Sequence, residues 1–185
     1  MVSESLAPLS ERLIIYIDGS CQENRNVGAA TPAGWGLVVV KGDAGIGRGG
    51  GDVIHENSGR VLTDSSDQNW LGAEVGSNNT AELSALAHAL RWLLNGEGEG
   101  VVTIRGDSQY ALNIAQSIWK AKANKILAAR VQELWKEVTT IRAVKADHIR
   151  AHRGHRWNER ADHLAWRAGT GESPLPLQFW KPGKR

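Results

Sequence analysis

The sequence predicts an α/β domain built around one mixed five-stranded sheet that helices flank. Three strand-like segments come first, at residues 13–17, 35–40 and 53–63, and the turn-rich loops between them favour antiparallel pairing. Two further strand-like segments, 101–105 and 141–149, alternate with helical ones, an order that favours parallel strands with helices on the sheet faces. The 185 residues are 41% hydrophobic and 23% charged, a composition typical of a single globular domain.

The loops between the expected strands have recognisable turn chemistry. The apolar run LIIYI at 13–17 ends at Asp18-Gly19-Ser20, and residues 41–52 are rich in glycine. Within that loop, residues 45–50 fit the pattern G-x-G-x-x-G, but a strand candidate follows instead of the helix that a dinucleotide site requires. We therefore interpret the loop as a hairpin connection. Residues 70–75 are expected to form another short strand or to continue one.

The clearest helix is expected from about residue 78 to residue 95. Ser77-Asn78-Asn79 supplies capping side chains, Asn95-Gly96 ends the pattern, and the leucines between them have helical spacing. Further helices are expected at 108–118 and 125–138. A last helix is expected to begin at Asn158, with its small and apolar residues on one face.

Composition excludes several classes of protein. The single cysteine rules out a disulfide framework and favours a reducing, cytoplasmic setting. It also leaves no Cys/His cluster for zinc, so His152 and His155, three residues apart, are the alternative metal pair. The apolar runs are too short to span a bilayer, and no signal peptide is evident. We expect a disordered tail at 1–10, one domain at 11–170 and a C-terminal tail at 171–185.

Charge and tryptophan are the two unusual features of the composition. The net charge is only +2, yet residues 141–185 hold ten Lys and Arg against four Asp and Glu, while residues 1–140 hold 12 against 16. A basic C-terminal part beside an acidic body indicates a polyanionic partner, with an ordinary solvated surface as the alternative. Of the eight tryptophans, Trp70 and Trp157 are expected to be the more exposed.

Four acidic residues stand where the parts of an α/β site meet. Asp18 and Asp107 closely follow apolar strands, while Glu82 and Asp162 lie near the starts of helices. Each has an ordinary explanation on its own, as a turn residue, a cap or a partner of the helix dipole. If they converge at one sheet edge, their repulsion requires bound cations or raised pKa values. Hard cations such as Mg²⁺ prefer carboxylate oxygens.

Four short motifs occur in order along the chain. They are YIDGSC at 16–21 with AGWG at 33–36, SNNTAEL at 77–83, GDSQY at 106–110, and HRGH at 152–155 with NERAD at 158–162. Any one of them is a weak signal, but four in this order, on the expected strands and helices, are highly specific. Together they resemble the type 1 ribonuclease H family over about residues 12–169.

The resemblance implies the ribonuclease H-like fold and endonucleolytic hydrolysis of the RNA strand of RNA–DNA hybrids, leaving 5′-phosphate and 3′-hydroxyl ends. Asp18, Glu82, Asp107 and Asp162 match the family's metal-binding acids. In the family these acids hold two Mg²⁺ ions, for which Mn²⁺ substitutes. His152 matches the family's loop histidine, which is thought to help proton transfer or product release.

The resemblance also implies residues that contact the substrate. Some positions of the family motifs face the hybrid, whose 2′-hydroxyl groups distinguish RNA from DNA. The matching positions here are Asn78, Gln109, Asn158 and the backbone near Cys21. The alternatives are helix capping for Asn78, an ordinary surface position for Gln109 and a small buried residue for Cys21. The arginines of the loop at 150–156 are expected near phosphates.

The chain departs from the family pattern in two loops. The loop after Asp18 is longer than usual and lacks an Asn-Pro-Gly turn, and the interval from Asp107 to His152 is too short for the full basic protrusion of many bacterial members. We therefore expect weaker or altered hybrid binding. Trp119, in that interval, is either a contact to the DNA strand or a core indole. A monomer without an obligate protein partner is expected.

Two rival functions remain open at this point. The first is a catalytically silent nucleic-acid-binding domain of the same fold, against which the presence of all four acids argues. The second is a nuclease or recombinase that acts on DNA, against which the NNTAE and DSQY motifs argue.

Overall fold

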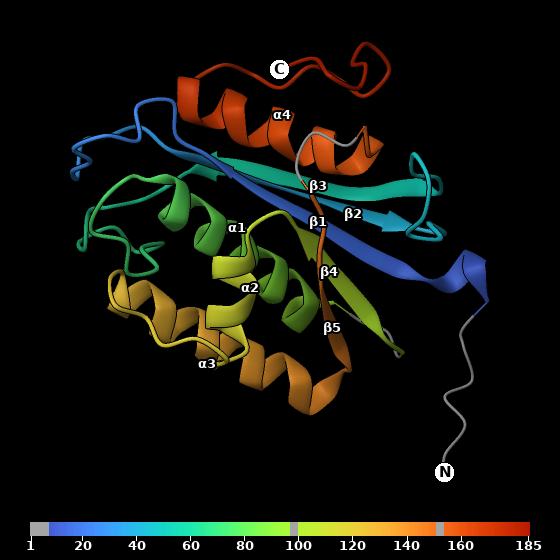
Figure 1. Ribbon diagram of the computed structural model, residues 1–185, viewed down its shortest axis with the longest axis horizontal. Coiled ribbons are helices and arrows are strands. Elements are labelled where there is room, and N and C mark those ends of the chain that lie inside the picture. Colours follow the sequence, from blue (N-terminus) through green and yellow to red (C-terminus); the bar gives the residue numbers. More distant parts are fainter. Residues whose placement is uncertain (1–7, 97–99, 151–153) are drawn as a thin grey trace.

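The computed structural model describes residues 8–96, 100–150 and 154–185, which form one sheet flanked by helices (Figure 1). The strands lie in the order β3-β2-β1-β4-β5. β1 pairs antiparallel with β2, as does β2 with β3, whereas β4 is parallel to β1 and β5 to β4. This confirms the predicted mixed five-stranded sheet. The strands are β1 (Leu13–Ser20), β2 (Gly34–Lys41), β3 (Asp52–Arg60), β4 (Val102–Gly106) and β5 (Val144–His148).

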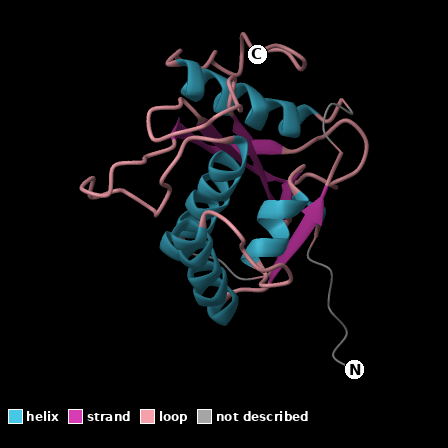
Figure 2. Cartoon of the chain, turned by 60° about the vertical axis from the view of Figure 1, so that its left-hand side comes forward, coloured by secondary structure: helices cyan, strands magenta, loops and turns pink. Residues whose placement is uncertain are grey.

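Helices cover both faces of the sheet (Figures 1 and 2). On one face α1 packs against β1 and against α3, and α2 packs between α1 and α3. On the other face α4 alone crosses β1, β2 and β3. The helices are α1 (Asn78–Asn95), α2 (Gln109–Ala115), α3 (Lys125–Ile141) and α4 (Arg156–Thr170). In the described part of the chain, no helix is both long and apolar enough to cross a membrane.

Strand β1 divides the hydrophobic core into two layers because its side chains alternate between the two faces of the sheet. Ile15 and Ile17 belong to the larger layer, together with the buried leucines of α1 and α3. Ile14 and Tyr16 belong to the smaller layer, together with Trp157 of α4. The aspartate that follows Ile17 therefore lies on the same face as Tyr16, towards α4.

Two glycines let helix backbones come directly against the strands beside Asp18. A Cβ atom added to Gly36, which pairs with Asp18 across the sheet, would lie 2.6 Å from the carbonyl oxygen of Ala161 in α4. A Cβ atom on Gly19 would lie 2.4 Å from the backbone nitrogen of Glu82 in α1. No side chain larger than hydrogen fits at either place, so α4 and α1 are both held in contact with β1 and β2 at the level of Asp18.

Several element boundaries differ from the sequence-based expectations. Residues 70–75 form no strand, and the third strand ends at Arg60 instead of residue 63. Helix α4 begins two residues before Asn158. That earlier start turns Trp157 inwards, where it is 4% exposed and donates its indole N–H to the carbonyl oxygen of Gly50 at 2.7 Å. The expectation of an exposed Trp157 was therefore wrong.

The two ends of the chain behave differently. A short 3₁₀ helix at Leu9–Glu11 precedes β1, and the rest of the predicted N-terminal tail, residues 1–7, lies outside the described residues. The C-terminal tail, residues 171–185, returns along α4 (Figure 1). The Arg160 guanidinium of α4 is 2% exposed and donates to both carboxylate oxygens of Glu56 in β3 and to the carbonyl oxygen of Leu175 in the tail. This arginine therefore joins the sheet, α4 and the tail.

Candidate active site

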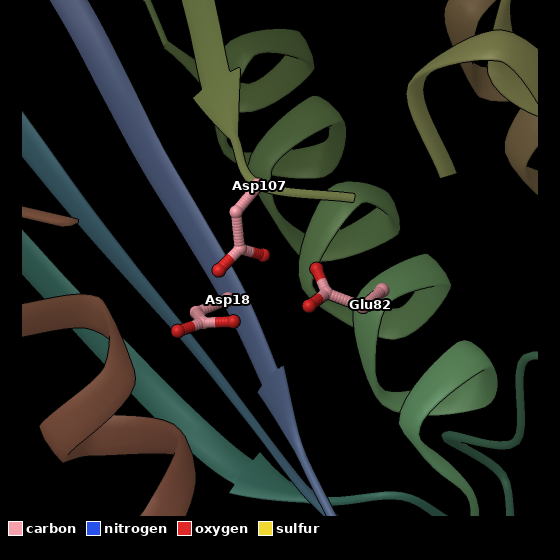
Figure 3. Close-up of side chains that lie close together, drawn as sticks. All are labelled: Asp18, Glu82 and Asp107. Atoms are coloured by element: carbon pink, nitrogen blue, oxygen red, sulfur yellow. The ribbon is translucent and has the colours of Figure 1, made fainter. Parts of the chain in front are cut away.

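Three carboxylates converge at one edge of the sheet (Figure 3). Asp18 lies near the end of β1, Asp107 directly follows β4, and Glu82 lies in the second turn of α1. One oxygen from each carboxylate lies within 4.8 Å of the others. Because β1 and β4 are parallel neighbours, their carboxyl ends fall at the same edge, and this places the two aspartates side by side.

The start of α1 is fixed by its cap, and the cap positions Glu82. The Ser77 hydroxyl oxygen accepts a hydrogen bond from the backbone N–H of Thr80 at 3.1 Å, and the Thr80 hydroxyl oxygen accepts one from the backbone N–H of Ser77 at 2.9 Å. This reciprocal pair is a capping box, which defines the first turn of the helix. With the first turn against Gly19, the Glu82 side chain points towards Asp18 (Figure 3).

Burial and mutual repulsion alter the acidity of this group. Asp18 is 4% exposed and Glu82 is 7% exposed. Burial, followed by the negative charge of Asp107, raises the pKa of Asp18 well above its ordinary value. Burial, followed by the charge of Asp18, likewise raises the pKa of Glu82. Glu82 Oε2 is buried and has no hydrogen-bond partner among the described residues.

This donor set fits a divalent cation. Buried carboxylates that lie close together repel one another and are unstable as anions. A hard cation such as Mg²⁺ or Mn²⁺ takes carboxylate oxygens as ligands and would supply both the charge and the missing partner for Glu82 Oε2. The three acids therefore form a candidate cation site.

The fourth predicted acid, Asp162, lies close by but in a different arrangement. It is on α4, one residue after Ala161, whose carbonyl oxygen lies against Gly36. Its negative charge is among the causes that raise the pKa of Asp18. Asp162 does not belong to the group of three, and its carboxylate is instead paired with Arg185 of the tail.

The predicted substrate contacts divide into exposed and buried positions. Asn78 is exposed at the start of α1, and its backbone N–H donates to Asn24 Oδ1 at 3.0 Å, so Ser77 and not Asn78 is the cap. Gln109 is exposed at the start of α2. Cys21 and Asn158 are 9% and 4% exposed, so neither side chain is presented at the surface. The prediction for Cys21 concerned its backbone and stays a prediction, as do those for Asn78 and Gln109.

The substrate contact expected at Asn158 stays a prediction, although its side chain is buried. Its Oδ1 atom is buried without a hydrogen-bond partner among the described residues. Asn158 is the third residue of α4 and follows the buried Trp157 in its first turn. His152, predicted as a catalytic residue, lies outside the described residues, and its role stays a prediction.

Sequence reasoning missed a row of polar side chains beside the carboxylates. The Tyr16 hydroxyl donates to the carboxylate of Asp43 and lies 3.3 Å from Nε2 of His155. Arg105 donates to the Tyr16 hydroxyl at 3.4 Å and to Asp147 Oδ2 at 2.6 Å. The spacing could have predicted this row. Tyr16 and Arg105 each precede one of the two strand-end aspartates by two residues, and residues two apart in a strand share a face of the sheet. His155 is thus engaged with Tyr16.

Comparison with known proteins places this arrangement in a family. The family model for RNase H matches residues 10–169, most of the chain. The chain belongs to the ribonuclease H family. Ribonuclease H of Thermosynechococcus vestitus is 30% identical to this ribonuclease H family member, with 91% of this chain and 94% of the relative covered. Ribonuclease HI of Caulobacter vibrioides is 31% identical, with 85% of this chain and 92% of the relative covered.

Solved structures of RNase H1 proteins have a fold similar to that of this ribonuclease H family member. RNase H1 of Halobacterium salinarum NRC-1 is 26% identical, with a TM-score of 0.59 and coverage of 85% of this chain and 96% of that one. LC11-RNase H1, solved in complex with an RNA/DNA hybrid, is 26% identical with a TM-score of 0.59. That match covers 86% of this chain and 98% of LC11-RNase H1.

Proposed function

We propose that this ribonuclease H family member is an endonuclease that hydrolyses the RNA strand of RNA–DNA hybrids with the help of divalent cations. The convergence of Asp18, Glu82 and Asp107 within 4.8 Å carries the proposal, because it creates a carboxylate site that needs a cation. The hybrid bound in the structure of LC11-RNase H1 supports the choice of substrate. The nearby Asp162 completes the set of four acids that the family motifs contain.

Each group of residues has a part in this reaction. Four acids would hold two cations, Mg²⁺ by preference with Mn²⁺ as a substitute: Asp18, Glu82, Asp107 and Asp162. Bound there, the cations would supply the positive charge that activates an attacking water and stabilises a leaving 3′-oxygen. The resulting ends are a 5′-phosphate and a 3′-hydroxyl. Asn78 and Gln109, both exposed at helix starts near the acids, contact the minor groove, where the 2′-hydroxyls of RNA lie.

Cleavage of matched substrates tests the proposal. Labelled hybrid, double-stranded RNA and double-stranded DNA are incubated with the wild type, Asp18→Asn and the control Asp52→Asn, an exposed acid at the far end of β3. We expect the wild type and Asp52→Asn to cleave only the hybrid, with Mg²⁺ or Mn²⁺ present. Asp18→Asn should lose at least about a hundredfold in rate, since it removes a ligand at the reacting phosphate.

Two outcomes would contradict the proposal. If the wild type binds the hybrid but leaves it intact with both cations, the better interpretation is a catalytically silent nucleic-acid-binding domain. If Asp18→Asn cleaves as fast as the wild type, the site lies elsewhere. Enzymatic end-labelling of the products determines whether the cut leaves a 5′-phosphate and a 3′-hydroxyl.

A further inference from the structure

We propose that Arg185 is a positioning residue for Asp162 and that it competes with a cation for that carboxylate. This inference rests on the proposed function, in which Asp162 is a cation ligand. The competition would make the C-terminal tail an adjustable part of the site, because cation binding at Asp162 requires the arginine to release at least one oxygen.

The contact between Arg185 and Asp162 uses both carboxylate oxygens. Arg185 Nε donates to Asp162 Oδ2 at 3.0 Å, and a second guanidinium nitrogen donates to Oδ1 at 3.1 Å. Paired donors of this kind fix the orientation of a carboxylate as well as its charge. The same guanidinium lies over the ring of Trp166, 4.6 Å from its centre. Arg185 is thus held between an acid and an aromatic ring of the same helix.

The tail delivers Arg185 to this place through buried contacts. His163, with no exposed surface, lies on the next position of α4, and its Nε2 accepts a hydrogen bond from the backbone N–H of Leu175 at 3.0 Å. Its Nδ1 therefore carries the proton and donates to the carbonyl oxygen of Lys184 at 3.0 Å. The Trp180 indole, 5% exposed, donates to the same carbonyl oxygen at 2.9 Å. These contacts fix the residue that directly precedes Arg185.

The placement of the pair explains why it bears on the cation site. Asp162 directly follows Ala161, whose carbonyl oxygen lies against Gly36, the residue that pairs with Asp18 across the sheet. This contact brings the start of α4 to the strand position that carries Asp18. Among the described residues, the salt bridge of Asp162 is made by Arg185 of the tail. A divalent cation that approaches Asp162 must take at least one oxygen from a bidentate partner. One that approaches Glu82 meets Oε2, which has no hydrogen-bond partner among the described residues.

Binding of Mn²⁺ to the substrate-free protein tests the proposal. The electron paramagnetic resonance signal of free Mn²⁺ is titrated with the wild type, Arg185→Gln, Arg185→Lys and the control Lys181→Gln, which removes an exposed charge from the same tail. We expect Arg185→Gln to tighten the weaker Mn²⁺ site about two- to five-fold, the range that a partly exposed ion pair supports. Arg185→Lys should fall between, and Lys181→Gln should match the wild type.

A second pair of variants separates competition from a general change in charge. In an Asp162→Asn background, Arg185→Gln should no longer alter Mn²⁺ binding, because the shared carboxylate is gone. If Arg185→Gln leaves Mn²⁺ binding unchanged in the wild-type background, or changes it equally in both backgrounds, the proposal is overturned. Since the titration uses neither hybrid nor cleavage, it stays informative if the wild type fails to cut the hybrid.

Discussion

At the scale of single residues, the site contains buried carboxylates that destabilise the fold but are suited to binding cations. Asp18 and Glu82 are nearly buried and close together, and Glu82 Oε2 has no hydrogen-bond partner among the described residues. Their raised pKa values mean that the folded protein holds protons that the unfolded chain would release. The stabilising contribution of each acid is therefore fully present below its ordinary pKa and is lost as the pH rises through the raised value.

The first prediction follows from that sign. Without divalent cations, Asp18→Asn should increase the free energy of unfolding at pH 7 by about 1–2 kcal/mol, or about 2–8 °C in melting temperature, because a neutral amide replaces a repelled carboxylate. The gain should shrink as the pH falls towards the ordinary aspartate pKa of 3.8. Thermal melts in EDTA from pH 3.5 to 8 measure it, with Asp52→Asn as the exposed control.

Addition of Mg²⁺ to the same melts should reverse the order. The wild type should gain melting temperature through cation binding, whereas Asp18→Asn should gain much less. If Asp18→Asn is less stable than the wild type in EDTA at pH 7, the repulsion between these carboxylates is not the dominant effect at this position.

At the scale of elements, the site depends on how closely two helices approach the sheet. Gly19 and Gly36 flank Asp18 in space, one against α1 and the other against α4. The capping box at Ser77 fixes where α1 begins. Because each helical residue advances about 1.5 Å along the axis, this start also fixes the position of Glu82 relative to Asp18. We infer that the close approach of the backbones at Gly19 and Gly36 contributes to the separation of the acids.

Gly19→Ala tests this element-scale requirement. Its Cβ atom would lie 2.4 Å from the Glu82 backbone nitrogen, so α1 must move away from β1. We expect a loss of about 1–3 kcal/mol in the free energy of unfolding, measured with urea, and a large loss of hybrid cleavage. Gly28→Ala is the matched control, because nothing lies within 4 Å of a Cβ atom there. Equal behaviour of the two variants would disprove the requirement.

The order of the elements and the two aspartates at strand ends could be predicted from the sequence, and the finer geometry could not. Apolar runs ending at Asp18 and Asp107 place both acids at one sheet edge once the strands are parallel. The expected start of α4 was two residues late, and the expected exposure of Trp157 was wrong. The tail contact of Asp162 is set by tertiary packing, for which no local pattern exists.

At the scale of the whole molecule, the small net charge is the sum of an acidic part and a basic part of the chain. The acids that matter lie together at the sheet edge, and the C-terminal part supplies most of the excess basic charge. One arginine of that part, Arg160, is consumed by a buried ion pair with Glu56, and Arg185 pairs with Asp162. Fewer arginines are therefore free for phosphates than the sequence count indicates.

Salt dependence of hybrid binding tests this count. With about three phosphate contacts, affinity should fall about 40-fold between 50 and 200 mM salt. Fluorescence anisotropy of a labelled hybrid, with the non-cleaving Asp18→Asn variant, measures the loss. A fall of about a thousandfold or more, typical of six or more contacts, would contradict the expectation of weakened binding.

Trp119, in the short connection between α2 and α3, has a consequence for spectroscopy. It is 45% exposed, whereas the other seven tryptophans, all within the described residues, are buried or partly buried. Its indole is therefore the one most open to water and to a dissolved quencher such as acrylamide. We expect this ring to contribute most to the red edge of the tryptophan fluorescence spectrum, so that its emission reports on the surface that also carries Lys120 and Lys122.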